Sequence, residues 1–227
     1  MTDLLQEQIA YYRSRAQEYN QWWYREGRYD RGEEHNRRWF EEVERLRTVL
    51  NRLPQQKRIL ELAAGTGIWT RELVKIGQHV TAVDASPEML AINRAELNNS
   101  SITYLQADVF EWTPAEPYDM VFFSFWLSHV PPDRLSRFLQ SVATMLNPGG
   151  HLFLIDSQRV DESTAKDHVI PEEGSTLERR LNDGRVFRIV KVFYKPDELQ
   201  AALLEAGIQA DVSLTETFFI YAQGQKL

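Results

Sequence analysis

The stretch Arg58-Ile-Leu-Glu-Leu-Ala-Ala-Gly-Thr-Gly-Ile-Trp-Thr70 joins an apolar segment to a turn of small residues. The apolar run at 59–62 is short and begins with a β-branched residue, which favours a strand over a helix. In the turn, Gly65 and Gly67 let the backbone pass close to a ligand. A helix that starts behind such a turn presents backbone N–H groups, which suit a carboxylate or a phosphate. The sequence therefore predicts the floor of a binding site at this turn.

Outward from this turn, strand-like segments alternate with helical ones from Pro54 onward. The pattern predicts strands at 59–62, 79–83, 102–105, 118–123, 152–155, 186–193 and 212–222. Helices are expected at about 68–76, 87–97, 133–146 and 196–205. Strands that alternate with helices in this way predict a parallel sheet with helices on both faces.

Individual residues predict where several of these helices and strands begin or end. Gly77 stands where the helix before it needs a left-handed C-terminal cap. Ser86 is expected to cap the next helix, with Pro87 as the first helical residue. The sequence Asn147-Pro-Gly-Gly150 predicts a turn before the fifth strand.

The first 53 residues have a different character, since they read as helical and are dense in aromatic residues. Gly27 and Gly32 flank a polar loop that divides this region into two helices, the second at 33–50. We interpret residues 1–53 as a helical cap or lid on a domain formed by 54–227. The polar stretch at 156–185 is long for a compact domain, which suggests a second lid segment.

Three arginines near the polar loop of the cap, Arg25, Arg28 and Arg31, are candidates to hold an acidic substrate. The surrounding region mixes arginines with acidic residues, so a solvated surface role is favoured for each of them.

Composition narrows the class of protein. The chain has 227 residues, a formal net charge of −7 and no cysteine, so it cannot form disulfides or thiolate metal sites. The negative charge argues against a nucleic-acid partner. The N-terminus lacks the features of a signal peptide and no run reaches membrane-spanning length. We expect a soluble cytoplasmic protein without a membrane partner, and the sequence leaves its oligomeric state open.

Three carboxylates, Glu61, Asp84 and Asp108, fall at or just beyond the ends of the first three strands. In open α/β sheets ligands bind at this edge, so these side chains are expected to lie close together. The spacing of Asp84 from the glycine turn suits an acid that accepts hydrogen bonds from ribose hydroxyls.

Four motifs in this region resemble those of the class I S-adenosylmethionine-dependent methyltransferases. The turn after Glu61 resembles the first motif, usually written E/D-x-G-x-G-x-G, with Ala63 where the first glycine most often stands. Val83-Asp-Ala-Ser-Pro-Glu-Met-Leu90 and Gln106-Ala-Asp-Val109 are similar to the second and third motifs. Leu146-Asn-Pro-Gly-Gly-His151 resembles the turn before strand five. The resemblance covers residues 58 to about 156.

This resemblance implies a Rossmann-like α/β fold, with a mostly parallel seven-stranded sheet whose antiparallel last strand is inserted beside the sixth. It implies S-adenosyl-L-methionine as cofactor and S-adenosyl-L-homocysteine as product. In the family, the acid at Asp84 holds the ribose, Ala85 and Met89 flank the adenine, and Asp108 accepts from the adenine amino group. The cofactor-binding residues so expected are Glu61, Ala63, Gly65, Gly67, Asp84, Ala85, Met89, Asp108, Val109 and Ser124.

The loop after the fourth strand is expected to reach the reacting methyl group. His129 in this loop is the candidate general base because its intrinsic pKa lies near neutrality; the alternative is a structural hydrogen bond to the backbone. Asp156 is a weaker candidate. The predicted substrate contacts are Tyr12, Trp23, Trp126 and Asp156.

The aromatic residues favour a small apolar or aromatic acceptor, with methylation at oxygen preferred over nitrogen or carbon. Phe123-Ser-Phe-Trp126 stands where amino-methylating enzymes of nucleobases and glutamine carry Asn/Asp-Pro-Pro-Tyr/Phe. No acidic cluster of a metal-dependent catechol enzyme is evident, so no metal is expected. Two alternatives stay open: a nicotinamide-dependent oxidoreductase, and a non-catalytic protein that binds S-adenosylmethionine.

Overall fold

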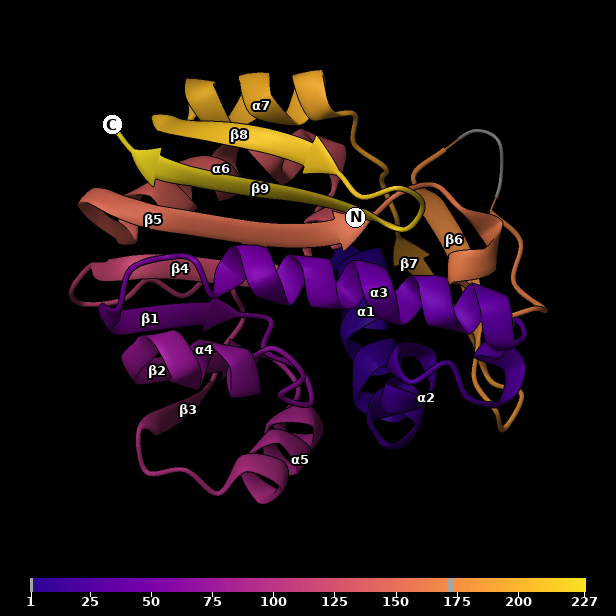
Figure 1. Ribbon diagram of the computed structural model, residues 1–227. Coiled ribbons are helices and arrows are strands. Elements are labelled where there is room, and N and C mark those ends of the chain that lie inside the picture. The colour runs from indigo at the N-terminus through magenta and orange to yellow at the C-terminus, as the bar shows by residue number, and fades with distance from the viewer. Residues whose placement is uncertain (1, 171–173) are drawn as a thin grey trace.

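Seven strands form the central sheet of the protein, whose computed structural model describes residues 2–170 and 174–227. Their order across the sheet is β3-β2-β1-β4-β5-β9-β8 (Figure 1). The strands are β1 Gln56–Leu62, β2 Gly77–Asp84, β3 Ile102–Gln106, β4 Tyr118–Ser124, β5 Leu146–Ser157, β8 Ile208–Leu214 and β9 Phe219–Lys226.

The strand directions confirm the expected topology. Strands β3, β2, β1, β4 and β5 pair in parallel, whereas β9 runs antiparallel to both of its neighbours, β5 and β8. The last strand of the chain is therefore inserted into the sheet. The segment expected as one strand at 212–222 is divided by a turn, where the Glu42 carboxylate accepts a hydrogen bond from the backbone N–H of Phe218.

Helices cover both faces of the sheet, as predicted. Besides α1 Thr2–Arg15 and α2 Tyr19–Trp23, they are α3 Glu33–Leu50, α4 Thr70–Ile76, α5 Pro87–Leu97, α6 Leu135–Thr144 and α7 Pro196–Glu205. One apolar core includes Leu60 of β1 with α6 and α7, and the other includes its neighbour Ile59 with α3 and α4. Successive residues of β1 thus point to opposite faces. Single turns of 3₁₀ helix occur at Ala16–Glu18, Gly27–Tyr29, Leu127–His129, Pro132–Arg134 and Asp161–Ser163.

The prediction of a sixth sheet strand at 186–193 was wrong. Strand β7 (Val186–Val190) does not join the central sheet but pairs antiparallel with β6 (Thr176–Arg180) in a separate hairpin. Its apolar residues pack with those of β6 against Tyr11 of α1, so the cap completes their burial. The stretch at 156–185 is therefore not irregular throughout, because it contains β6.

The left-handed cap expected at Gly77 was also wrong. Gly77 has an extended backbone, with φ of −117°, and begins β2 directly after α4. A Cβ at this position would lie 2.6 Å from Cδ1 of Ile59. The glycine is therefore explained by close packing of α4 and β2 against β1. The N-cap expected at Ser86 is confirmed, since its hydroxyl accepts from the backbone N–H of Met89 at 3.2 Å.

Helices α1 and α2 and the β6–β7 hairpin gather beside the carboxyl ends of the parallel strands (Figure 1). Helix α3 instead lies along one face of the sheet, where Trp39 and Leu46 are fully buried. No helix in residues 2–170 and 174–227 is long and apolar enough to cross a membrane.

The turn after β1 carries a left-handed alanine. Ala63 has φ of 52°, as Gly65 does at 55°, and the left-handed region is unfavourable for a residue with a Cβ. We expect Ala63→Gly to raise the free energy of unfolding by about 1 kcal/mol, measured by urea denaturation. The control is Ala64→Gly. Because Ala64 lies outside the left-handed region, glycine brings no relief there, and this variant should be less stable than the wild type. Equal losses in both variants would contradict the assignment of strain to Ala63.

Candidate functional site

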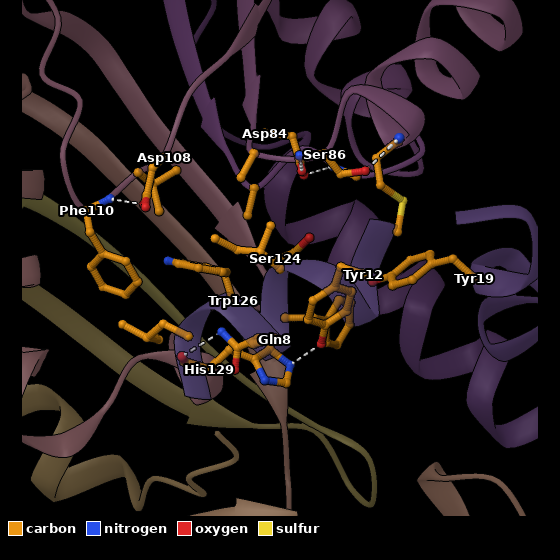
Figure 2. A pocket seen from close by; sticks show the side chains of 18 residues that line it. Gln8, Tyr12, Tyr19, Asp84, Ser86, Asp108, Phe110, Ser124, Trp126 and His129 are labelled. Carbon is orange, nitrogen blue, oxygen red and sulfur yellow. Dashed lines mark hydrogen bonds between the residues drawn. The ribbon is translucent and has the colours of Figure 1, made fainter. Parts of the chain in front are cut away.

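A cavity lies at the carboxyl ends of the first four strands and, with the solvent at its mouth, has about 780 Å³ of empty space. The turns after these strands supply most of its wall, and helix α1 closes it from the opposite side (Figure 2). The lining residues are Leu5, Gln8, Ile9, Tyr12, Tyr19, Ala63, Gly65, Asp84, Ala85, Ser86, Met89, Asp108, Val109, Phe110, Ser124, Phe125, Trp126 and His129.

Asp84 is held at the end of β2 by two backbone donors. Its carboxylate accepts from the N–H of Gly65 at 2.9 Å and from the N–H of Ser86 at 2.8 Å. Burial raises the pKa of Asp84 to about 6, although the hydrogen bonds from Ser86 and Gly65 oppose that rise. The carboxylate is therefore ionised at neutral pH and fixed in orientation, as an acceptor for two hydroxyl donors requires.

Glu61 lies behind this wall and is 1 % exposed. Thr70 donates its hydroxyl to the Glu61 carboxyl at 2.6 Å, and Asn93 donates to the same hydroxyl at 2.8 Å. Burial raises the pKa of Glu61 to about 8, and the nearby charge of Asp84 acts in the same direction. Glu61 thus carries a proton at neutral pH and stabilises the turn from behind.

The turn after β3 supplies a third carboxylate. Asp108 accepts from the backbone N–H of Phe110 at 2.9 Å (Figure 2). The Phe110 ring lies 5.5 Å from that of Trp126, so apolar surface borders this end of the cavity.

Tyr12 and His129 form a buried pair at the other end of the cavity (Figure 2). Nδ1 of His129 lies 2.6 Å from the Val190 carbonyl oxygen, which can only accept, so Nδ1 carries the proton. Nε2 then accepts from the Tyr12 hydroxyl at 2.7 Å. Burial, aided by the charge of Lys191, holds the pKa of His129 well below its usual range, so the ring is neutral.

A second cavity adjoins the first and, with the solvent at its mouth, has about 580 Å³ of empty space. Tyr12, Tyr19, Phe125 and His129 line both cavities and so form their common wall. Beyond this wall, the second cavity is lined by side chains from the cap, from β5 and its following loop, and from the β6–β7 hairpin. They include Arg15, Ser157, Arg179 and Lys191.

Most of the predicted site residues meet at the first cavity, but four do not line it. Glu61 and Gly67 lie behind the turn, and a Cβ on Gly67 would be 2.6 Å from Oδ1 of Asn93. Trp23 is buried against Trp39 and Trp69, where it borders a smaller cavity, and its expected substrate contact stays a prediction.

Asp156 is the fourth predicted residue outside the first cavity. It is 1 % exposed and accepts from the backbone N–H groups of Ser128 and Ser157 at 2.8 and 2.7 Å. Its carboxylate therefore positions the loop that carries His129.

The three cap arginines do not line either cavity. Arg25 donates to the backbone carbonyls of Glu162 and Ser163, and Arg31 donates to those of Asp161 and Thr164. Arg28 pairs with Asp167 at 3.3 Å. The solvated surface role that the sequence favoured does not describe Arg25, which is 2 % exposed, and the three side chains tie the cap to the chain after β5.

Sequence reasoning missed part of both cavities. Leu5, Gln8 and Ile9 share a face of α1 with Tyr12, and their helical spacing could have indicated this. Arg15, Arg179 and Lys191 are buried, but no local sequence pattern distinguishes them from the arginines and lysines on the surface. Their burial depends on how α1 packs against the β6–β7 hairpin.

Within the described part of the chain, no group of three or more His, Cys, Asp or Glu side chains could hold a metal ion.

Comparison with known sequences identifies methyltransferases as relatives. A family model described as "Methyltransferase domain" matches residues 59–150. A ubiquinone biosynthesis O-methyltransferase of Xanthomonas axonopodis pv. citri is 31% identical over 172 residues, which cover 74% of this chain and 69% of the relative. The corresponding protein of Xanthomonas euvesicatoria pv. vesicatoria is 30% identical over 158 residues, with 68% and 63% covered. The chain thus spans about two thirds of the length of these relatives.

Solved structures give a similarity over the whole chain. The DhpI–SAH complex is 32% identical, has a TM-score of 0.81, and aligns over 100% of this chain and 98% of that one. The DhpI–SAM–HEP complex is 34% identical with a TM-score of 0.80, and 97% of each chain is covered.

The buried Glu61 predicts a pH dependence of stability. The folded protein keeps this proton up to a pKa of about 8, whereas the unfolded chain releases it near the ordinary value of 4.5. The stabilisation from Glu61 is therefore full at low pH and is lost as pH rises toward 8, by up to about 1.4 kcal/mol per pH unit. Between pH 6 and 8, we expect the free energy of unfolding of Glu61→Gln to change less with pH than that of the wild type.

Urea denaturation across this pH range measures the effect. The control is Glu205→Gln, because the Glu205 side chain on α7 is exposed. An unchanged pH slope in Glu61→Gln would show that Glu61 is already ionised in the folded protein.

Proposed function

The chain belongs to the class I S-adenosylmethionine-dependent methyltransferases, and on this premise we propose that it methylates a small-molecule acceptor, preferably at oxygen. One arrangement supports this function above all: the cavity lined by the methyltransferase motifs shares a wall with a second cavity. Two adjoining cavities suit the transfer of a group between two bound molecules. The relatives named O-methyltransferases favour oxygen as the acceptor atom.

The residues of the first cavity fit the cofactor. Asp84 is an oriented, ionised acceptor for the ribose hydroxyls, and Ala85 and Met89 are proposed to flank the adenine. Asp108 and the backbone N–H of Val109 are proposed to hydrogen-bond the adenine. The left-handed backbone at Ala63 and Gly65 lets the chain approach the ligand closely.

When bound, S-adenosylmethionine supplies a methyl group on a sulfonium, which is already activated for transfer. A lone pair of the acceptor oxygen would form the new C–O bond as the C–S bond breaks, and the sulfur would leave as a neutral thioether. The protein has to hold the acceptor in line and exclude water. It must also take up a proton if the acceptor atom carries one.

We propose that His129 takes this proton through Nε2. The Val190 carbonyl holds the other ring proton on Nδ1, so Nε2 is the basic atom, and it lies in the wall common to both cavities. Tyr12 donates to Nε2 and therefore must move aside or relay the proton. The low pKa of His129 keeps the ring in its neutral form.

Residues 1–53 are proposed to act as a cap on the reaction site. Helix α1 supplies one wall of the first cavity and is tied to α5 by the Arg13–Glu88 ion pair at 2.8 Å. The stretch at 156–185, of which 171–173 lie outside the described residues, is proposed as a second lid segment. Arg179 of this stretch lines the second cavity, and the cap arginines donate to carbonyls at 161–164. A net charge of −7 and the lack of cysteine support a cytoplasmic location and an acceptor other than nucleic acid.

Calorimetric titration tests the cofactor assignment. The protein should bind S-adenosylmethionine and S-adenosylhomocysteine saturably but not NAD. Asp84→Ala should weaken binding of both by about 100-fold, because it removes a partly buried charged acceptor. Asp211→Ala, at an exposed site on β8, is the control and should bind normally. Tight binding by folded Asp84→Ala would disprove the ribose assignment.

His129 should matter for transfer rather than for cofactor binding. We expect His129→Ala to bind S-adenosylhomocysteine within about twofold of the wild type, and to lower kcat by about 100-fold or more once an acceptor is found. Tyr12→Phe should show whether the Tyr12 hydroxyl relays the proton. A remote histidine variant, His79→Ala, is the control. Unchanged kcat in His129→Ala would leave this residue with a structural role.

A further inference from the structure

We propose that the second cavity binds an oxyanion of the methyl acceptor, a carboxylate or a phosphoryl group, through Arg15, Arg179 and Lys191. The acceptor would therefore be a small acid. This inference rests on the proposed function, since it takes the first cavity as the cofactor site.

The three cations are buried although they come from separate parts of the chain. Arg15 is 8 % exposed at the end of α1, Arg179 is 7 % exposed in β6, and Lys191 is 8 % exposed just after β7. All three line the second cavity. Burying like charges together is costly unless they are compensated.

The described residues compensate the charges of these three cations only in part. Lys191 donates to the Ser128 hydroxyl at 2.8 Å and lies 3.5 Å from the Asp156 carboxylate. Arg15 donates to the Tyr29 hydroxyl at 3.2 Å, and its Nε has no hydrogen-bond partner. Arg179 reaches the carbonyl of its own neighbour Glu178 at 3.3 Å. In the described part of the chain, neither arginine has a carboxylate within ion-pair distance.

The cavity as a whole is positive. Its lining in residues 2–170 and 174–227 contains no Asp or Glu, and Asp156 lies behind Lys191 as the nearest counter-charge. Burial lowers the pKa of His168 to about 4, so this side chain adds no charge at neutral pH. Burial also lowers the pKa of Lys191 and of Arg179, a penalty that a bound anion would relieve.

The remaining polar groups suit an oxyanion. The lining carries hydroxyl groups that can donate to it, from Tyr11, Tyr19, Tyr29 and Ser157. Guanidinium groups bind carboxylates and phosphoryl groups through paired donors.

Arg25 shows how a buried arginine with a purely structural role is compensated in this protein, and Arg15 and Arg179 can be compared with it. Arg25 donates to two backbone carbonyls, at 2.7 and 3.3 Å, and its guanidinium lies 4.6 Å from the Trp39 ring centre. It lines neither cavity. Arg15 also lies over a ring, 4.9 Å from the centre of Tyr19, but unlike Arg25 both Arg15 and Arg179 line the second cavity and neither donates to two backbone carbonyls.

The position of the cations relative to the common wall explains how an acid would be oriented. Tyr12, Tyr19, Phe125 and His129 separate the cations from the first cavity. An acceptor anchored by its oxyanion in the second cavity would present its other end to this wall, where the methyl group is proposed to arrive.

Binding of simple anions tests the proposal. We would titrate the protein, with and without S-adenosylhomocysteine, with acetate, benzoate, inorganic phosphate and phenylphosphonate at constant ionic strength. Benzamide is the neutral control. We expect at least one anion to bind saturably while benzamide does not, and Arg179→Gln and Arg15→Gln to weaken that anion by about tenfold or more. Tighter binding of acetate and benzoate would indicate a carboxylate site, and tighter binding of inorganic phosphate and phenylphosphonate would indicate a phosphoryl site.

Arg180→Gln is the matched control, because Arg180 is the next residue of β6 and is exposed. Arg179→Lys should restore part of the affinity if charge is what matters. Failure of all four anions to bind folded protein, or equal binding by the Arg15 and Arg179 variants, would overturn the proposal. If S-adenosylhomocysteine binds while the anions fail, the methyltransferase function stands. If the cofactor fails while the anions bind, the proposed function is wrong.

Discussion

The hydrogen bond from the Gly65 N–H to the Asp84 carboxylate joins the turn after β1 to the end of β2. It depends on a left-handed backbone at Ala63 and Gly65, which turns the chain sharply at the edge of the sheet. Two carboxylates come close together there, and they cannot both be ionised at low cost. Burial, aided by the nearby charge of Asp84, keeps the proton on Glu61, and Asp84 carries the charge that faces the cavity.

The cap connects this site to the second cavity through a single helix. Gln8 and Tyr12 lie one turn apart on α1 and line the first cavity, while Tyr11 and Arg15 line the second. The β6–β7 hairpin packs on the same helix and brings Arg179 and Lys191 beside Arg15. Because one rigid element borders both cavities, displacement of α1 would open both together.

The loop after β4 holds His129 by contacts from distant parts of the chain. Gln8 of α1 donates to the His129 carbonyl at 3.2 Å and accepts from the N–H of Val190 at 3.0 Å. Asp156 fixes the neighbouring Ser128 from β5. The orientation of the histidine ring therefore depends on the cap, on β5 and on the hairpin, and not on its own loop alone.

The sequence alone determined the parallel sheet, the helices at 33–50 and 196–205, and the gathering of Asp84 and Asp108 at one edge. These features follow from local periodicity and from the rule that parallel strands end together. Tertiary structure alone decided the place of Val186–Val190, the extended backbone of Gly77, and which arginines face a cavity. The physical reason is that burial depends on contacts between segments far apart in the chain. Arg25 and Arg15 have the same chemistry and both belong to the cap, but their packing partners tie Arg25 to the Glu162 carbonyl and place Arg15 in the lining of the second cavity.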